Sequence, residues 1–382
     1  MSIDLKERIG TSAFAFRGYN VTNLGKSAQL LAHPRYGPLV GQLLAEASAL
    51  CAVATGRKVS LADRVRAGEP STLESFAEDI ALVVSIELAQ IRLLKEFFGV
   101  EYARARLAYG YSLGELSALF ASGVYQMADV LPAILAMAGE CAELAKDVTM
   151  GIVFSRGAVL DFDAVSRLCR DINRQGNGVI AISAYLAPNT VLLLGQRDTI
   201  ERFKKQMPEA LPGQTYLRTN HHRWPPLHTP LLWERNIPNR AALQMHTVPG
   251  GSIAPEPPVL SLVAAKTTYN DYNSRELLNR WIDQPQRLWD AVYETLVAGV
   301  DVVIHVGPEP NLIPATFKRL SDNVKAQLSG WTASSIGLRA MSGMARRPWL
   351  SKLLSSRTAL LRAPFVEHVI LEDWLLEQPG KA

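Results

Sequence analysis

The sequence predicts an α/β protein: a parallel sheet flanked by helices, with a smaller sheet unit inserted into it. Short apolar runs alternate with segments of helical periodicity, which is the order of a parallel sheet with helical connections. One such run, 105–109, passes through a sharp turn rich in glycine into a helix. Residues 148–220 change to the order strand, helix, strand, strand, helix, strand, which is typical of a ferredoxin-like unit.

The N-terminal part predicts one strand and two long helical segments. Residues 13–16 are apolar and predict a buried strand that ends in a turn at 18–20. Residues 26–56 and 73–98 have helical periodicity, and the second segment is apolar on more than one face. We therefore expect 73–98 to be buried against the sheet. The polar stretch 57–72 between them predicts a surface connection.

Ser112 lies in the strongest local motif, G-x-S-x-G over 110–114. An apolar strand precedes it, and apolar residues follow at helical spacing. This context is that of the nucleophile elbow of α/β-hydrolase-like cores. There glycines permit a strained backbone, and the helix N-terminus faces a developing anion. An ordinary Ser N-cap is the alternative. We expect Ser112 to be a nucleophile.

The rest of the chain returns to the main fold after the inserted unit. Residues 124–147 predict a helix, 234–258 a loop, 259–264 a strand, 274–282 and 285–298 helices, and 301–306 a very apolar strand. We therefore predict an α/β core of 1–147 and 221–329, a ferredoxin-like subdomain of 148–220, and a C-terminal extension of 330–382. The extension is basic and then apolar, and we expect it to pack on the core.

His228 stands before Thr-Pro, in a stretch that also holds His221 and His222. Spacing alone leaves two interpretations of His228 open. It is either a surface histidine at a helix N-terminus or the general base for Ser112.

Composition excludes several classes of function. The chain has 382 residues, a net charge of +4 and 20% charged residues, which does not indicate nucleic-acid binding. Cys51, Cys141 and Cys169 are far apart and have no metal-ligand spacing, so we expect free thiols, a reducing cytoplasm and no metal. The first residues lack the apolar run of a signal peptide, and we expect no membrane span.

Four motifs, in order, resemble those of the malonyl-CoA:acyl-carrier-protein transacylase family, which includes the acyltransferase domains of polyketide and fatty-acid synthases. FAFRGYN (14–20) resembles F-x-F-P-G-Q-G, and GYSLGE (110–115) resembles G-H-S-x-G-E. LHTPLL (227–232) is similar to S-H-x-x-L-M, and VIHVGP (303–308) is similar to the E-V-G-P-G turn. The resemblance covers about residues 12–325.

The resemblance implies an acyltransferase in which Ser112 forms an acyl-serine and His228 is its base, with ping-pong kinetics. It implies that the backbone N–H groups of Leu113 and Tyr19 hold the oxyanion. The family orients its histidine with a main-chain carbonyl, for which Trp281 is the nearest match. The implied substrate is a CoA or phosphopantetheine thioester, with no bound cofactor, and the implied partner is an acyl carrier protein.

Three departures from the family pattern concern the acyl pocket. Tyr111 replaces a histidine, Leu227 replaces a serine, and Ala138 replaces the arginine that pairs with the malonyl carboxylate. A buried malonyl carboxylate without that partner would be costly. We therefore expect an acyl group other than malonyl. Arg17 is a candidate replacement cation, but a surface role is the simpler interpretation.

The sequence is also compatible with other functions. The same Ser/His pair would serve a hydrolase that removes stalled acyl groups from carrier proteins. A lipase or esterase would need an HGGG-like loop, which is absent from the sequence, and a non-catalytic carrier-binding protein would not need the pair. Basic pairs are candidate contacts for an acidic carrier protein, with solvated surface charge as the alternative for each: Lys204-Lys205 and Arg346-Arg347.

Overall fold

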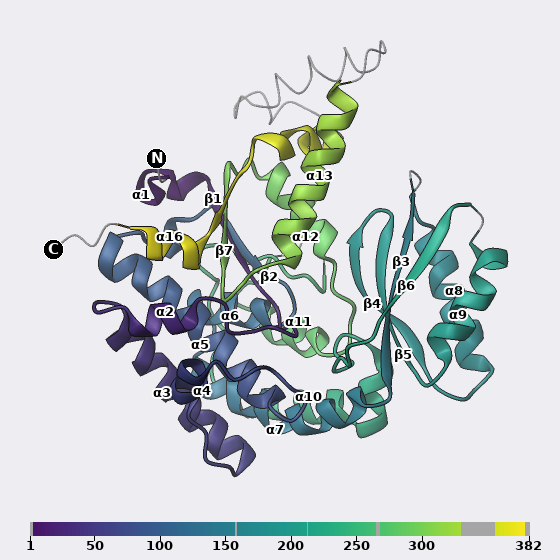
Figure 1. Cartoon of the computed structure of the whole chain (residues 1–382), viewed down its shortest axis with the longest axis horizontal. Helices are drawn as coiled ribbons and strands as arrows, with labels where there is room; N and C mark the ends of the chain where they lie inside the picture. The colour runs from purple at the N-terminus through teal and green to yellow at the C-terminus, as the bar shows by residue number, and fades with distance from the viewer. Residues whose placement is uncertain (1–2, 157–158, 212, 265–267, 330–355, 379–382) are drawn as a thin grey trace.

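The computed structural model describes residues 3–156, 159–211, 213–264, 268–329 and 356–378. Within them, a parallel sheet with helices lies beside an antiparallel sheet with its own helices (Figure 1). The predicted α/β class with an inserted ferredoxin-like unit is confirmed. The pair Arg346-Arg347 lies outside the described residues.

The parallel sheet has the strand order β2-β1-β7-β8. Its two faces are covered by different helices, as alternate residues of β1 demonstrate. Phe14 and Phe16 pack in the cluster that includes α5 and α6, whereas Ala13 and Ala15 pack with α12 and α13. The strands are β1 (Ser12–Phe16), β2 (Leu107–Gly110), β7 (Val302–Val306) and β8 (Glu367–Ile370).

Helix α5 (Phe76–Phe98) is the central helix of the core, and most of its residues up to Leu94 are buried. It packs against α3, α6 and α7. The helices before β2 are α1 (Leu5–Arg8), η1 (Ile9–Thr11), α2 (Ser27–Ala32), α3 (Gly37–Thr55), α4 (Leu61–Ala67) and η2 (Tyr102–Arg104). Those that follow in the core are α6 (Leu113–Ala121), α7 (Met127–Ala145), η3 (Pro230–Arg235), α10 (Ile237–Thr247), α11 (Ser274–Trp281), α12 (Leu288–Val297), α13 (Leu312–Ser329), η4 (Ser356–Phe365) and α16 (Leu371–Glu377).

The antiparallel sheet has the order β4-β5-β3-β6, which is the ferredoxin-like arrangement. Its helices pack on one face, and its other face, with Met150 and Leu194, packs toward the core. A parallel bridge between Ala184 and Gln286 connects the edge of this sheet to the core. The elements are β3 (Val148–Ser155), α8 (Phe162–Arg174), β4 (Ile180–Ala187), β5 (Thr190–Gln196), α9 (Thr199–Ala210) and β6 (Thr215–Asn220).

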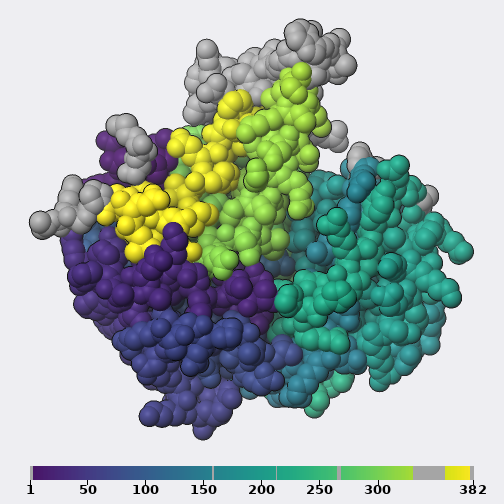
Figure 2. All heavy atoms as spheres, in the orientation of Figure 1, coloured from purple at the N-terminus to yellow at the C-terminus, as the bar shows by residue number. Residues whose placement is uncertain are grey.

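The C-terminal segment is more than an extension packed on the core. Its strand β8 pairs in parallel with β7 and forms an edge of the central sheet. Figure 2 shows the segment (yellow) on the surface between α13 and the N-terminal part of the chain. The domain boundaries predicted from the sequence stay a prediction, but residues of the predicted extension complete this sheet.

Three local predictions were wrong. The stretch 259–264 is not a strand: it makes isolated bridges, from Val259 to Ala108 of β2 and from Leu260 to Thr268. Pro257 and Pro258 precede it and have no N–H to donate to a ladder. Two short helices, α4 and α10, lie in stretches predicted as a connection and as a loop.

Helix α3 is, by length and composition alone, apolar enough to cross a membrane, and the expectation of no membrane span stays a prediction. Among the described residues it is the one helix with this property. One of its faces is buried against α5 and α7 and includes Val40, Leu43, Leu44 and Cys51.

The elbow between β2 and α6 is tightly packed around its glycines. A Cβ on Gly110 would collide with the backbone of Gly114, and one on Gly114 would collide with the carbonyl oxygens of Phe16 and Arg17. The start of α6 therefore lies directly against the end of β1. This close approach is possible only without side chains at these positions.

We expect Gly114→Ala to lower the free energy of unfolding by more than about 3 kcal/mol, because backbone atoms on both sides prevent relaxation. The matched control is Gly41→Ala in α3, where a new Cβ would make only an ordinary contact with Leu31. That variant should be unchanged or more stable by up to about 1 kcal/mol. Urea unfolding of both variants measures the difference, and equal stability would contradict the close packing.

Candidate active site

Ser112 is held at the turn of the elbow in a strained conformation, with φ 53° and ψ −118°. Its backbone is fixed on both sides by α11 and the segment after it. The N–H of Ser112 donates to Oε1 of Gln286 at 3.1 Å, and its carbonyl accepts from Nε1 of Trp281 at 3.0 Å. These bonds fix the direction in which the hydroxyl points.

Glu115, in the first turn of α6, anchors this helix to the segment that begins at Val259, which lies beside β2. Its Oε1 accepts from the hydroxyl of Tyr269 at 2.7 Å and from the N–H of Leu262 at 3.2 Å. Burial raises the pKa of this carboxyl to about 7. Its role is structural, because the carboxyl bonds to this segment and not to Ser112.

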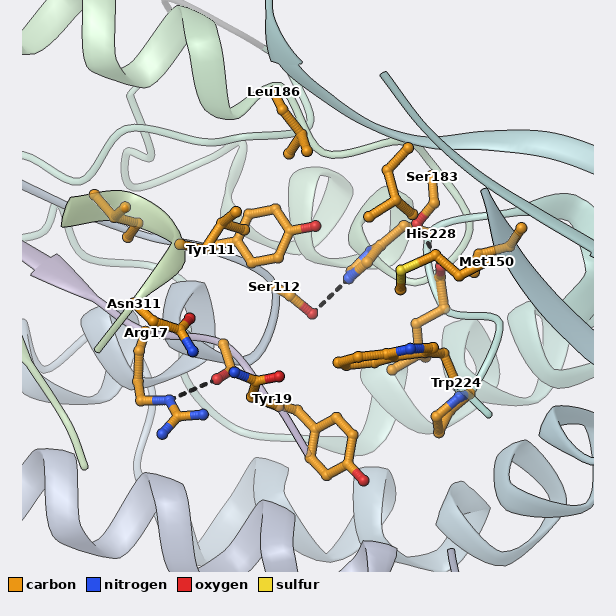
Figure 3. A pocket seen from close by; sticks show the side chains of 18 of the residues that line it. Arg17, Tyr19, Tyr111, Ser112, Met150, Ser183, Leu186, Trp224, His228 and Asn311 are labelled. Atoms are coloured by element: carbon orange, nitrogen blue, oxygen red, sulfur yellow. Dashed lines mark hydrogen bonds between the residues drawn. The ribbon is translucent and has the colours of Figure 1, made fainter. Parts of the chain in front are cut away.

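His228 reaches Ser112 from the segment that follows the antiparallel sheet (Figure 3). The Oγ of Ser112 lies 2.7 Å from Nε2 of His228, and Nδ1 of His228 lies 2.7 Å from the carbonyl oxygen of Trp281. A carbonyl only accepts, so Nδ1 carries the proton and Nε2 presents its lone pair to the serine. Spacing alone left the role of His228 open and the resemblance implied a general base; the structure places its ring against Ser112.

Burial keeps the imidazole of His228 neutral. The side chain is buried, which lowers its pKa to about 4, and the Trp281 carbonyl opposes this shift only in part. A neutral imidazole is the form that accepts a proton from serine. The predicted main-chain partner therefore lies where a serine triad usually has a carboxylate.

The two predicted oxyanion donors lie on either side of Ser112. Leu113 begins α6, and Tyr19 follows β1 in a loop whose Gly18 lies against the backbone of Tyr111. Within the described part of the chain, neither the N–H of Leu113 nor that of Tyr19 has a hydrogen-bond partner. Both are free to bind an anion, and their role in holding the oxyanion stays a prediction.

Two cavities meet at Ser112. The larger, of about 230 Å³, lies between the core and the open face of the antiparallel sheet, and Figure 3 shows Tyr111, Met150 and Trp224 around it. The smaller, of about 30 Å³, is called here the small chamber and lies between Ser112, α5 and α7. Its walls include Ile80, Ile134, Met137, Ala138 and Cys141.

The predicted pocket residues are divided between these cavities. Tyr111 lines the larger cavity, Ala138 lines the small chamber, and Leu227 lines both. The sequence placed them in one acyl pocket, and the structure does not bring Tyr111 and Ala138 into one cavity. The two departures therefore alter different cavities.

The interpretation of Arg17 as a surface residue was wrong. Its side chain is buried and donates to the carbonyls of Gly18, Thr22 and Pro308 and to Oδ1 of Asn23. A guanidinium held by these acceptors does not swing into the small chamber. Arg17 borders only the larger cavity, so it does not replace the cation missing at position 138.

Sequence reasoning missed two residues at the site. Gln286 is fully buried, and besides its bond to Ser112 its Nε2 lies 3.4 Å from Nδ1 of His228. Phe76 lines both cavities. Gln286 carried no local signal, because its role depends on contacts with Ser112 and His228, which are distant from it in the sequence. Phe76 carried no signal, since it was one apolar residue among many in a long helix.

Two further expectations concern other parts of the molecule. Lys204 and Lys205 are exposed on α9, which packs on the face of the antiparallel sheet turned away from the larger cavity. They are therefore not beside the opening to Ser112. In the described ranges, no group of three or more His, Cys, Asp or Glu side chains is placed to hold a metal ion.

We expect the reactivity of Ser112 to be insensitive to pH over an unusually wide range. A fluorophosphonate probe should label Ser112 at a constant rate from pH 8 to about pH 5, and the rate should halve near pH 4, where His228 gains its proton. If His228 had the ordinary pKa of 6.5, the labelling rate would already be halved at pH 6.5. Circular dichroism at each pH controls for unfolding, and a midpoint near 6.5 would contradict the buried imidazole.

Gln286→Leu should slow labelling of Ser112 by about tenfold, equivalent to about 1.4 kcal/mol. The substitution keeps the volume of the side chain but leaves the N–H of Ser112 without its acceptor. The matched control is Gln284→Leu, two residues earlier, where the side chain is exposed and bonds only to Asp283. Equal rates in the two variants would show that Gln286 does not position the nucleophile.

Comparisons with known proteins agree with the motifs. No protein-family model matches the chain. It is 22% identical over 265 residues to a malonyl CoA-acyl carrier protein transacylase of Bacillus subtilis, covering 69% of this chain and 62% of that protein. It is 28% identical over 276 residues to a reducing polyketide synthase of Botryotinia fuckeliana, of which it covers 10%. The chain thus spans less than two thirds of these relatives.

Solved structures of the same kind of protein share the fold. The FabD structure from Acinetobacter baumannii has a TM-score of 0.64 at 20% identity and covers 79% of this chain and 89% of its own. A type II polyketide synthase malonyl-transacylase in complex with its acyl-carrier protein has a TM-score of 0.61 at 21% identity. The sequence relatives and the solved structures are thus malonyl-CoA:acyl-carrier-protein transacylases and polyketide synthases. This confirms the resemblance predicted from the motifs and gives this chain the fold of that family.

Proposed function

We propose that this protein is an acyltransferase that takes an acyl group from a thioester onto Ser112 and passes it to the thiol of a carrier protein. The observation that carries the proposal is the array Ser112–His228–Trp281, in which each contact measures 2.7 Å and a neutral imidazole faces the hydroxyl. The sequence relatives support the choice of a thioester as substrate.

The array supports a two-step exchange. In the first step, Nε2 of His228 takes the proton of Ser112, Oγ bonds to the thioester carbon, and the C–S bond breaks as the thiol leaves with that proton. In the second step, a carrier thiol gives its proton to His228 and attacks the acyl-serine. The C–O bond then breaks and Ser112 regains its proton. The free N–H groups of Leu113 and Tyr19 would hold the oxyanion in both steps.

The acyl group of this proposal is not malonyl. Its site is the small chamber, where no charged side chain is present among the lining residues. The thiol of Cys141 in its wall is neutral, since burial raises its pKa to about 12. An ionised carboxylate placed there would lose its water without gaining a cation, and that costs several kcal/mol.

The phosphopantetheine arm, or that of CoA, occupies the larger cavity. This cavity opens between the core and the antiparallel sheet, and among its walls are the side chains of Asn20, Ser183 and Asn311, whose polar atoms suit the amides of the arm. The thioester is a substrate and no resident cofactor is needed. A structural neighbour that is a transacylase bound to its acyl-carrier protein supports such a protein as the partner.

Incubation with acyl donors, read by intact mass, tests the function. We expect a stable adduct on Ser112 from acetyl-, propionyl- and butyryl-CoA or the matching acyl-carrier proteins, and an adduct from malonyl-CoA that forms more than about 100-fold more slowly. Ser112→Ala should form none of them. A malonyl adduct as fast as the others would overturn the acyl assignment.

A carrier thiol then separates transfer from hydrolysis. Addition of a holo-acyl-carrier protein to the isolated acyl-enzyme should move the acyl group to the carrier faster than water releases it as free acid. Release of free acid at the same rate with and without carrier would favour the editing hydrolase. No adduct from any donor would favour a protein that only binds carriers.

A further inference from the structure

The side chain of Phe76, the first residue of α5, lies where three cavities meet. It lines the larger cavity and the small chamber at Ser112. It also lines a third space of about 410 Å³ between α3, α5 and α7, called here the outer groove. Phe76 and Ala138 are the residues that the small chamber and the outer groove share.

We propose that Phe76 is the end wall of the acyl chamber and restricts the enzyme to short acyl groups of up to about four carbons. This inference rests on the proposed function, because it takes Ser112 as the attachment point of the acyl group. A chamber of about 30 Å³ has room for two or three water-sized groups beyond the thioester carbon. A longer chain would meet the ring of Phe76 before it reached the outer groove.

The wall is fixed in place. Phe76 is 2% exposed, and its ring packs edge-on against Tyr19 at a centroid distance of 4.8 Å. The turn before it is held by a buried pair in which Arg64 donates to Asp79 at 2.6 Å and both side chains bond to Ser75. The ring therefore does not move aside for a longer chain, and the chamber has a set length.

Because the side chain of Ala138 is small, Phe76 determines whether the small chamber is separated from the outer groove. A long side chain at position 138 would itself separate the chamber from the outer groove, but a methyl group leaves the aromatic ring as the main barrier. The outer groove beyond it reaches the surface, where Glu74, Glu143 and Lys146 are among its walls. Removal of the ring would join the two spaces and give a long acyl chain a path toward solvent.

The test compares rates of Ser112 acylation across acyl-CoA donors from two to twelve carbons, read by intact mass. In the unmodified protein we expect the rate to fall by roughly 100-fold between butyryl and octanoyl donors. In Phe76→Ala the octanoyl and dodecanoyl rates should rise to within about tenfold of the butyryl rate. Phe76→Leu, which disturbs the packing less, should move the limit in the same direction.

The matched control is Ile80→Ala, one turn along α5. Ile80 lines the small chamber but not the outer groove, so this variant enlarges a closed space and should extend the limit by no more than about three carbons. A larger side chain in the chamber should instead shorten the limit: in Ala138→Val, acylation by butyryl-CoA should be lost and acylation by acetyl-CoA retained. Circular dichroism confirms that each variant is folded.

The outcomes separate this inference from the proposed function. If no donor acylates the unmodified protein, the proposed function itself is wrong. If acetyl and butyryl donors react but octanoyl reacts equally fast, or if folded Phe76 variants keep the original limit, the acyltransferase stands and Phe76 is not its end wall. A Phe76→Ala limit no longer than that of Ile80→Ala would show that the outer groove takes no part.

Discussion

The contact between the elbow and the end of β1 is the constraint on which the candidate site depends. Gly110 and Gly114 permit α6 to start against the carbonyls of Phe16 and Arg17. The same contact gives Ser112 its positive φ and places the N–H of Leu113 next to the loop that holds Tyr19. Nucleophile and both predicted oxyanion donors are thus fixed by one packing interaction between two neighbouring strands and one helix.

Burial, rather than neighbouring charged groups, determines the protonation state of His228 and the polarity of the small chamber. His228 has a carbonyl as its orienting partner, a depressed pKa and no charged contact among its hydrogen bonds. The small chamber is apolar, and the guanidinium of Arg17, which borders the larger cavity, donates to carbonyls and to Asn23. In such surroundings an uncharged acyl group is accommodated at little cost, whereas a carboxylate is not.

The sequence predicted those parts of the molecule that are encoded locally. The elbow is recognisable from a local pattern, because its strand, glycine turn and helix are contiguous in the sequence. The order of strands and helices in 148–220 likewise predicted the second sheet. The roles of His228 and Trp281 came from the resemblance and not from spacing, since they meet Ser112 across more than one hundred residues of chain. Gln286, Phe76 and the edge strand β8 were missed because their positions depend on tertiary contacts that no local pattern encodes.

The low polarity of the chamber also bears on whether a thiol or water takes the acyl group. A water molecule is stably bound only where it finds two or more polar partners, and the walls of the small chamber offer almost none besides Ser112. Water must therefore approach through the larger cavity, the same space in which a pantetheine arm would lie. An arm bound there displaces water and presents a thiol, which is far more acidic than water and so needs less help from a weakly basic imidazole. In the proposed reaction a bound carrier arm therefore favours transfer over hydrolysis, because it excludes water from this cavity and supplies the more acidic thiol.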